Sequence, residues 1–265
     1  MSQQPTSIEQ VNFDAQTSNP ADIKKYFDEN GYVVVQNVFS ENELAPVRAR
    51  LDEIINDPSK APEGVGVGRE NDTLAEGVEG DPNNPVRNIS FMVRFDPTFQ
   101  DFARNATILK ITRALIGPKV KVFRDQALQK PPGGQAKPVH QDLSYFRVQP
   151  ADELVTAWVA TEDATTENGC MIYIPRSHRH GLFEIKHDPE RPVHHVPDTR
   201  GIAMEEEVLC PVPAGSVIFH HGYTLHRSGV NNSNTWRRSV QLHYAGSDAR
   251  SDNEKLNEEV SLEID

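Results

Sequence analysis

Two residues that can bind a metal ion lie two positions apart in the segment His140-Gln141-Asp142. Successive side chains of a β-strand point to opposite faces, so in an extended segment His140 and Asp142 point the same way. One imidazole nitrogen and one carboxylate oxygen then form part of a site for a divalent metal. A surface strand with two outward polar residues gives the same pattern, so this interpretation needs a third ligand from elsewhere.

A third candidate ligand, His226, follows a hydrophobic segment and begins a Gly/Asn-rich turn, where a ligand at the rim of a β-barrel would lie. Two histidines and one carboxylate form a facial triad that leaves three positions open on Fe(II). Alternation in the strand that begins eleven residues later places Arg237 and Ser239 on one face. A guanidinium and a hydroxyl that point inward together are suited to binding a carboxylate.

The ten histidines of the chain all lie at or after His140, so the first 139 residues contain none. We expect His220 and His221 to be structural, because they end the strand that precedes the turn. His243 shares the predicted inward face of Arg237 and is a candidate for the pocket wall.

Several further motifs resemble the phytanoyl-CoA dioxygenase family of Fe(II)/2-oxoglutarate-dependent oxygenases, over about residues 20–246. In chain order these are Asp28-x-x-Gly31-Tyr32-Val33-Val34-Val35, Asp125-Gln126 with Lys130-Pro131-Pro132, His140-Gln141-Asp142-Leu143-Ser144-Tyr145-Phe146, Trp158, Asn168-Gly169-Cys170, Ile174-Pro175-x-Ser177-His178, and His226 with Arg237. Their order and spacing agree with the family. Arg176 departs from it, because the family usually has glycine there, and we expect the difference to affect a turn and not the metal.

The resemblance implies that His140, Asp142 and His226 are catalytic residues that bind the metal, and that Arg237 binds the distal carboxylate of 2-oxoglutarate. The other cosubstrate residues that it implies are Gln126, Trp158 and Ser239. It implies Fe(II) with 2-oxoglutarate and O2, and hydroxylation of a substrate with release of succinate and CO2. A carboxylate at position 142 favours hydroxylation over halogenation, because related halogenases have a small residue there; desaturation and ring formation stay open.

The fold that the resemblance implies is mainly β with flanking α: a double-stranded β-helix of the jelly-roll or cupin-like kind with an N-terminal helical buttress. The sequence pattern agrees, and predicts one oxygenase domain over 19–246, between a flexible N-terminus at 1–18 and an acidic C-terminal tail at 247–265. Its helical front, 19–118, has helices starting at Asn19-Pro20 and Ser40 and a third over 98–116. Its β-helix core, 119–246, has strands predicted at 119–129, 154–161, 171–175, 207–212, 216–220 and 237–244.

Two segments without periodicity, 57–90 and 183–206, are predicted to be substrate lids. Arg147, Arg191 and Arg200 are close enough to these segments to meet an anionic substrate, although each also fits a solvated surface position. Two other functions stay open: a divalent-metal hydrolase that uses the same His/Asp/His site, and a non-catalytic binding member of the fold. A hydrolase has no use for the Arg237 and Ser239 pair.

The formal net charge of −12, from 27 Lys and Arg against 39 Asp and Glu, argues against sequence-independent binding to nucleic acid or anionic membranes. No apolar run approaches the roughly 20 residues that span a bilayer, and the N-terminus lacks the pattern of a secretory signal. Two cysteines are too few for a disulfide framework, which favours a reduced protein in the cytoplasm. We therefore expect a small-molecule substrate; the sequence leaves the oligomeric state open.

Overall fold

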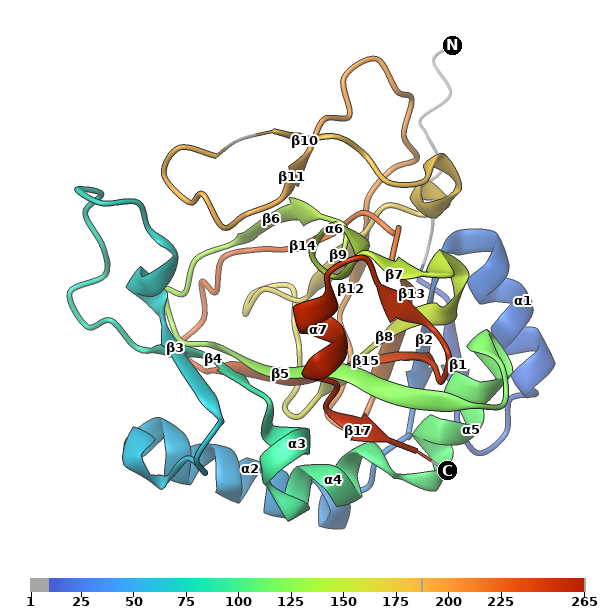
Figure 1. Ribbon diagram of the computed structural model, residues 1–265, viewed down its shortest axis with the longest axis horizontal. Helices are drawn as coiled ribbons and strands as arrows, with labels where there is room; N and C mark the ends of the chain where they lie inside the picture. Colours follow the sequence, from blue (N-terminus) through green and yellow to red (C-terminus); the bar gives the residue numbers. More distant parts are fainter. Residues whose placement is uncertain (1–9, 187, 265) are drawn as a thin grey trace.

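Two facing β-sheets form the centre of the fold, which confirms the predicted double-stranded β-helix (Figure 1). The computed structural model describes residues 10–186 and 188–264. The larger sheet has the strand order β1-β2-β13-β8-β15-β5-β4-β3, with β17 paired to β5, and the smaller sheet has the order β12-β9-β14-β6. Within the described chain, β1 and β2 are parallel and the other strand pairs are antiparallel.

The predicted core strands are present, with ends that differ by a few residues from the sequence pattern. The larger sheet consists of β1 (Asn12–Asp14), β2 (Tyr32–Gln36), β3 (Gly66–Arg69), β4 (Val86–Ser90), β5 (Val120–Lys130), β8 (Leu154–Ala160), β13 (Val217–His221), β15 (Arg237–Gly246) and β17 (Leu262–Glu263). The smaller sheet consists of β6 (Lys137–His140), β9 (Met171–Tyr173), β12 (Val208–Cys210) and β14 (His226–Ser228). Two short pairs are β7 (Val148–Gln149) with β16 (Arg250–Ser251), and β10 (Ile185–Lys186) with β11 (Val196–Pro197).

Side-chain alternation gives the larger sheet two different faces. On β15, Val240, Leu242 and Tyr244 join a hydrophobic cluster with the helices, whereas the residues between them point toward the smaller sheet. A second cluster, which contains Trp158 of β8 and Tyr173 of β9, fills the space between the two sheets. The sheet therefore supports polar residues on its inner face with an apolar layer behind them.

The helical front covers the outer face of the larger sheet, as predicted. It contains α1 (Pro20–Asn30), α2 (Glu41–Asn56), α3 (Met92–Phe95), α4 (Pro97–Ala103) and α5 (Ala106–Ile116), while α6 (Leu143–Phe146) and α7 (Glu254–Glu258) lie later in the chain. Single 3-10 turns are η1 (Pro58–Lys60), η2 (Glu70–Thr73), η3 (Ala151–Glu153) and η4 (Ser177–His180). Within the described residues, none of the helices combines the length and apolarity that crossing a membrane requires.

The predicted third helix over 98–116 is wrong in one respect, because the structure divides it into α4 and α5. The side chain of Asn105 accepts hydrogen bonds from the backbone N–H groups of Thr107 and Ile108, which caps a new helix. The two predicted caps are present: Asn19 accepts from Ala21 N–H, and Ser40 forms its capping box. Such a cap satisfies backbone donors locally, so it can interrupt a hydrophobic period that otherwise continues.

Described residues near both ends of the chain, within the predicted flexible N-terminus and acidic tail, pair with strands of the larger sheet. Residues 1–9 lie outside the described residues, but β1 pairs with β2. At the other end, β17 pairs with β5, and Ser261 Oγ donates a hydrogen bond of 2.7 Å to the buried Asp125. The segment after residue 246 therefore forms part of the larger sheet and its packing.

The two predicted lid segments meet each other on one side of the barrel (Figure 1). The first contains a hairpin, β3 and β4, that extends the larger sheet, so it is more regular than its sequence suggests. The second contains the pair β10 and β11. Ala75 N–H donates to Glu190 O at 2.8 Å, and Arg191 donates to Thr73 Oγ1 at 2.6 Å.

Arg176 occupies the position at which the family usually has glycine. Its φ of +63° lies in the left-handed region, which glycine adopts without steric cost. The residue forms the turn before η4, so the departure affects a turn, as predicted.

Candidate active site

The three predicted metal ligands lie together between the two sheets. His140 ends β6 and His226 begins β14, and the two residues are cross-strand partners. Asp142 Oδ1 lies 3.7 Å from His140 Nε2 and 3.6 Å from His226 Nε2. One ligand atom from each residue falls within 4.8 Å of the others, and all three residues are buried. Their types and spacing are suited to one divalent metal ion.

Asp142 reaches this position by a different backbone path from the extended one that the sequence suggested. Strand β6 ends at His140, and Asp142 has φ −63° and ψ −37°, the helical conformation that leads into α6. Its carbonyl accepts from the N–H groups of Tyr145 at 3.0 Å and Phe146 at 3.2 Å. A helical turn, and not strand alternation, therefore directs the carboxylate toward His140.

Backbone contacts determine which nitrogen of each histidine faces the site. His140 Nδ1 lies 2.9 Å from Pro138 O, and His226 Nδ1 lies 2.9 Å from Thr224 O. A carbonyl can only accept, so each Nδ1 carries the hydrogen and each Nε2 presents a lone pair toward Asp142. Burial lowers the pKa of both histidines, which keeps the rings neutral. His226 Nε2 is buried without a hydrogen-bond partner in the described chain, as fits a metal ligand.

The second oxygen of Asp142 is held by hydrogen-bond donors. Thr156 Oγ1 donates to Asp142 Oδ2 at 2.5 Å, and His220 Nε2 lies 2.9 Å from the same oxygen. Thr156 in turn accepts from His243 Nδ1 at 2.8 Å, and Tyr173 OH bonds to His220 Nδ1 at 3.0 Å. Burial alone would raise the pKa of Asp142, but the hydrogen bond from His220 holds it well below its usual range. The carboxylate is therefore ionised, with Oδ1 left to face the two histidine ligands.

The register of three strands brings this network together. His220 of β13 and His243 of β15 both pair directly with Thr156 of β8. Sequence reasoning assigned His220 a structural role and did not identify Thr156. It made His243 a candidate for the pocket wall, but that ring lies behind Asp142 and outside the lining of the cavity. His220, Thr156 and His243 thus form a row across β13, β8 and β15. Only the pairing of the three strands reveals this row, because its residues lie far apart in sequence. His221 contacts Asp152 at 3.1 Å, which agrees with a structural role.

Arg237 lies buried on β15 with its guanidinium directed at the cavity. It donates to Ser239 Oγ at 3.2 Å, and its Cζ lies 5.5 Å from the centre of the Trp158 ring. Within the described chain it makes no ion pair with a carboxylate, and its Nε lacks a hydrogen-bond partner. Burial, together with Arg87, lowers the pKa of Arg237 to about 9. A buried cation without a counter-ion is suited to an anionic ligand.

The other predicted cosubstrate residues lie around Arg237. Gln126 lines the cavity and donates to Gln241 Oε1 at 2.7 Å across β5 and β15. Trp158 and Ser239 lie behind Arg237 and contact it, outside the lining of the cavity. They would thus orient the guanidinium more than touch a ligand.

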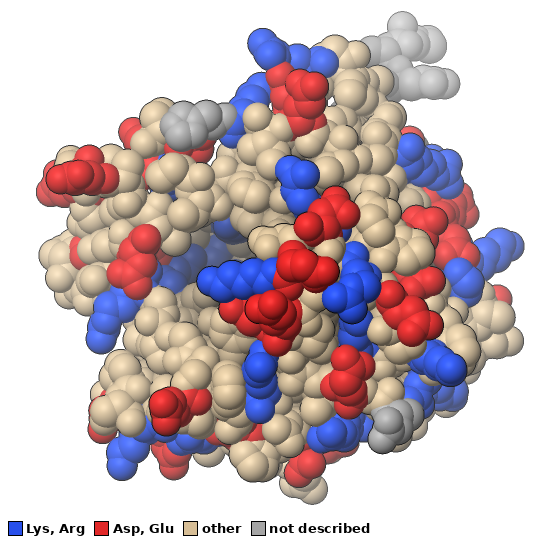
Figure 2. Space-filling model, in the orientation of Figure 1, with Lys and Arg blue, Asp and Glu red and all other residues tan. Residues whose placement is uncertain are grey.

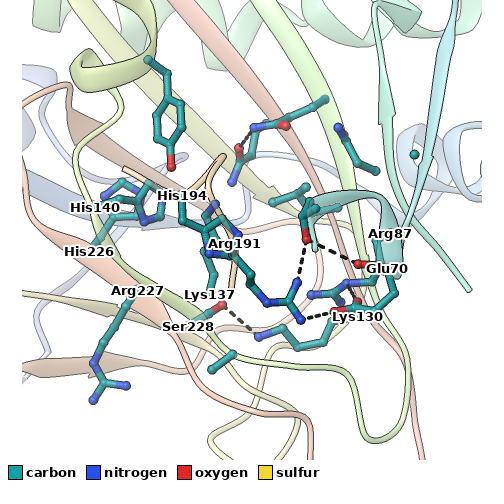
Figure 3. Close-up of a pocket in the computed structure, with 18 of the residues that line it drawn as sticks. Glu70, Arg87, Lys130, Lys137, His140, Arg191, His194, His226, Arg227 and Ser228 are labelled. Carbon is teal, nitrogen blue, oxygen red and sulfur yellow. Dashed lines mark hydrogen bonds and ion pairs between the residues drawn. The ribbon is translucent and has the colours of Figure 1, made fainter. Parts of the chain in front are cut away.

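One cavity of about 430 Å³ is lined by the three candidate ligands and by Arg237. Figure 3 shows part of its wall, with His140 and His226 on one side of it. Among its described lining residues seven are Lys or Arg and three are Asp or Glu, which reverses the charge balance of the whole chain. The cations are Arg69, Arg87, Lys130, Lys137, Arg191, Arg227 and Arg237. Figure 2 shows Lys and Arg side chains inside a hollow on this face. Arg191 lies in the wall, whereas Arg147 and Arg200 do not.

Comparison with known proteins identifies the class that this fold and site define. The chain is 28% identical over 244 residues to a probable phytanoyl-CoA dioxygenase of Caenorhabditis elegans, covering 86% of this chain and 76% of that protein. Its fold matches the carbocyclase SnoK from nogalamycin biosynthesis with TM-score 0.71 and 24% identity, covering 95% of each chain. It also matches the epimerase SnoN, solved with Fe3+, alpha ketoglutarate and nogalamycin RO, with TM-score 0.70 and 23% identity, covering 89% and 88%.

The profile of the family described as "Phytanoyl-CoA dioxygenase (PhyH)" matches residues 27–239, most of the chain. The chain therefore belongs to the phytanoyl-CoA dioxygenase family. This confirms the enzyme class that the sequence motifs predicted, the Fe(II)/2-oxoglutarate-dependent oxygenases.

Proposed function

We propose that the enzyme hydroxylates an unactivated C–H bond of a small-molecule metabolite, with His140, Asp142 and His226 as the iron ligands. The observation that carries the proposal is the arrangement within one cavity. Two histidine nitrogens and one carboxylate oxygen converge there, and a buried guanidinium without a counter-ion, Arg237, opens onto the same space. A facial triad and a site for one carboxylate are the two parts that this chemistry needs.

Fe(II), 2-oxoglutarate and O2 supply the oxidation: one oxygen atom of O2 enters the substrate as hydroxyl, the other enters succinate, and CO2 leaves. The protein binds and orients the reactants. Arg237 binds the distal carboxylate of 2-oxoglutarate, Gln126 forms the wall beside it, and Trp158 and Ser239 keep the guanidinium in place. The SnoN complex, with the same fold, holds iron and alpha ketoglutarate, which supports this assignment.

The two other functions fit the site less well. A divalent-metal hydrolase would use the three ligands but would leave Arg237 buried without a counter-ion, at a cost in stability. A non-catalytic member of the fold would be expected to lack a ligand or the arginine, and all four are present. The buried free thiols of Cys170 and Cys210 support action in the cytoplasm, where cysteines stay reduced.

An anaerobic titration tests the metal and cosubstrate sites together. Mixing the protein with Fe(II) and 2-oxoglutarate should give a weak visible charge-transfer band, and Asp142→Ala and Arg237→Ala should abolish or strongly weaken it. A wild-type protein without the band would support the hydrolase. An unchanged band in His226→Ala would refute the ligand assignment.

A succinate-release screen over classes of metabolite tests the reaction. Mass spectrometry of the product then separates hydroxylation, which adds one oxygen atom, from desaturation or ring closure, which removes two hydrogens. A product with two hydrogens fewer and no added oxygen would replace hydroxylation in the proposal.

A further inference from the structure

Lys137 lies in the cavity wall although its spacing from His140 predicts the opposite face. Three positions separate the two residues on β6, and strand alternation would direct them to different sides. On the partner strand β14 only two positions separate their partners, Ser228 and His226. The extra residue forms a β-bulge, which turns Lys137 to the same side as His140.

Lys137 differs from the other cations of the cavity because its ammonium group has no protein acceptor. Within the described chain, Nζ makes no hydrogen bond or ion pair, and its nearest specific contact is the ring of Tyr145, 5.5 Å away. The neighbouring cations are better satisfied: Arg87 pairs with Glu70, Arg227 pairs with Glu207, and Lys130 donates to Ser228 Oγ at 2.9 Å.

The surroundings of Lys137 are positive. Arg191 and Arg87 repel its charge, and the attraction comes from Asp142. A divalent ion bound to Asp142 would neutralise that attraction, so the loaded site leaves Lys137 without a counter-charge. Burial, with these neighbours, lowers the pKa of Lys137 to about 8.

Arg191 and His194 of the second lid segment line the same part of the cavity (Figure 3). Arg191 donates one N–H to Thr73 and lies 3.7 Å from a Glu70 carboxylate oxygen. Its remaining guanidinium N–H groups stay available to a ligand. His194 Nδ1 is buried without a hydrogen-bond partner in the described chain, and burial lowers the pKa of this ring to about 4. The ring is therefore neutral and can donate a hydrogen bond without adding charge.

We propose that Lys137, assisted by Arg191, binds an anionic group of the substrate, so that the substrate is a small organic anion carrying a carboxylate or a phosphate-type group. The proposal rests on the proposed function, because it assigns the second ligand of the same cavity. Lys137 stands on β6 of the smaller sheet, whereas Arg237 stands on β15 of the larger sheet. The cavity thus has one cationic position for the cosubstrate and a separate one for the substrate, with the three candidate metal ligands lining the same space.

Calorimetry with simple probes tests the assignment on the whole protein, loaded with Mn(II) and saturating 2-oxoglutarate in place of the reactive iron complex. The probes are hexanoate, pentylphosphonate and the neutral hexanamide, which share a short alkyl chain. We expect hexanoate or pentylphosphonate to bind on the order of 10- to 100-fold more tightly than hexanamide, as expected for a charge-assisted contact. The better of the two anions identifies the group.

Three lysine variants separate the contribution of Lys137 to anion binding from that of the other cations. Lys137→Met should remove the preference for the anion, Lys137→Arg should keep most of it, and Lys119→Met, an exposed lysine away from the cavity, should change nothing. Equal binding of the anions and the amide to wild type would overturn the proposal, and so would an unchanged preference in Lys137→Met.

The affinity for 2-oxoglutarate, measured in the same variants, separates the two proposals. Weaker 2-oxoglutarate binding in Lys137→Met, comparable to that of Arg237→Ala, would assign the lysine to the cosubstrate and overturn the substrate assignment. Failure of wild type to bind metal and 2-oxoglutarate would refute the proposed function alone. Titration of the metal-free protein with the three probes would then still decide whether Lys137 binds anions.

Discussion

Replacing Thr156 with valine would test whether the orientation of Asp142 depends on a single hydroxyl. Valine keeps the branched shape in the central strand β8, where both residues are favourable. It removes the 2.5 Å hydrogen bond to Asp142 Oδ2 and leaves the N–H of His243 without its acceptor. His220 still contacts the same oxygen, so the carboxylate keeps one of its two side-chain donors.

The expected loss has two parts. A hydrogen bond to an ionised group contributes about 1.5–3 kcal/mol, and an unsatisfied buried N–H costs about 1–3 kcal/mol. Relaxation and a water molecule would recover part of this, so we expect about 2 kcal/mol of lost unfolding free energy, or roughly 4–8 °C in Tm for a chain of this size. Because contacts behind a ligand typically change metal affinity about 10- to 100-fold, Fe(II) should bind that much more weakly.

The assay is an anaerobic Fe(II) titration with saturating 2-oxoglutarate, followed by the charge-transfer band, with thermal unfolding of the metal-free protein measured in parallel. Thr161→Val is the matched control, because Thr161 is also buried but its hydroxyl makes no hydrogen bond in the described chain. The reasoning is refuted if Thr156→Val binds Fe(II) as tightly as Thr161→Val does.

Three further predictions concern other parts of the molecule. Arg237→Gln should raise the KM for 2-oxoglutarate by about 100-fold, by removal of a charge-assisted pair, while metal affinity without cosubstrate stays near wild type in a titration; equal loss of both would contradict the role. Ser261→Ala should lower the unfolding free energy by about 1–3 kcal/mol in chemical denaturation, because the buried Asp125 oxygen loses its donor; an unchanged midpoint would mean that the C-terminal segment does not stabilise the barrel. The pKa of His194 falls from 6.5 to about 4 on folding, so between these values the unfolded chain binds more protons, and stability is lost as pH falls. Chemical denaturation of the metal-free protein at pH 7 and at pH 5 measures how much unfolding free energy is lost between the two. This loss should be about 1–2 kcal/mol smaller in His194→Gln than in wild type, and an equal loss would mean that the ring is exposed to solvent.

The sequence was sufficient for the strands of the barrel and for the order of the candidate ligands. Strand alternation and turn residues are local signals, so they predict β8, β13 and β15 and the inward face that carries Arg237. Motif resemblance then predicted the three residues that the structure brings together.

The features that the sequence did not reveal depend on pairing between distant segments. The β6 bulge is visible only against β14, and without it Lys137 is assigned to the wrong face. The break at Asn105 arises because a side-chain cap competes with an uninterrupted hydrophobic period. The C-terminal segment is polar and acidic, and its pairing with β5 could not be inferred from composition.

The row formed by His220, Thr156 and His243 has a consequence for when the protein can acquire its metal. His243 stands on β15, the last synthesised of the three strands that form this row, and it completes the support of Asp142 from β8. A nascent chain that lacks this strand has the three candidate ligands, but Thr156 lacks the donor that orients its hydroxyl toward Asp142. Iron loading should therefore follow completion of the chain. The bound ion then favours the correctly registered sheet over slipped alternatives, because only that register presents the complete set of donors.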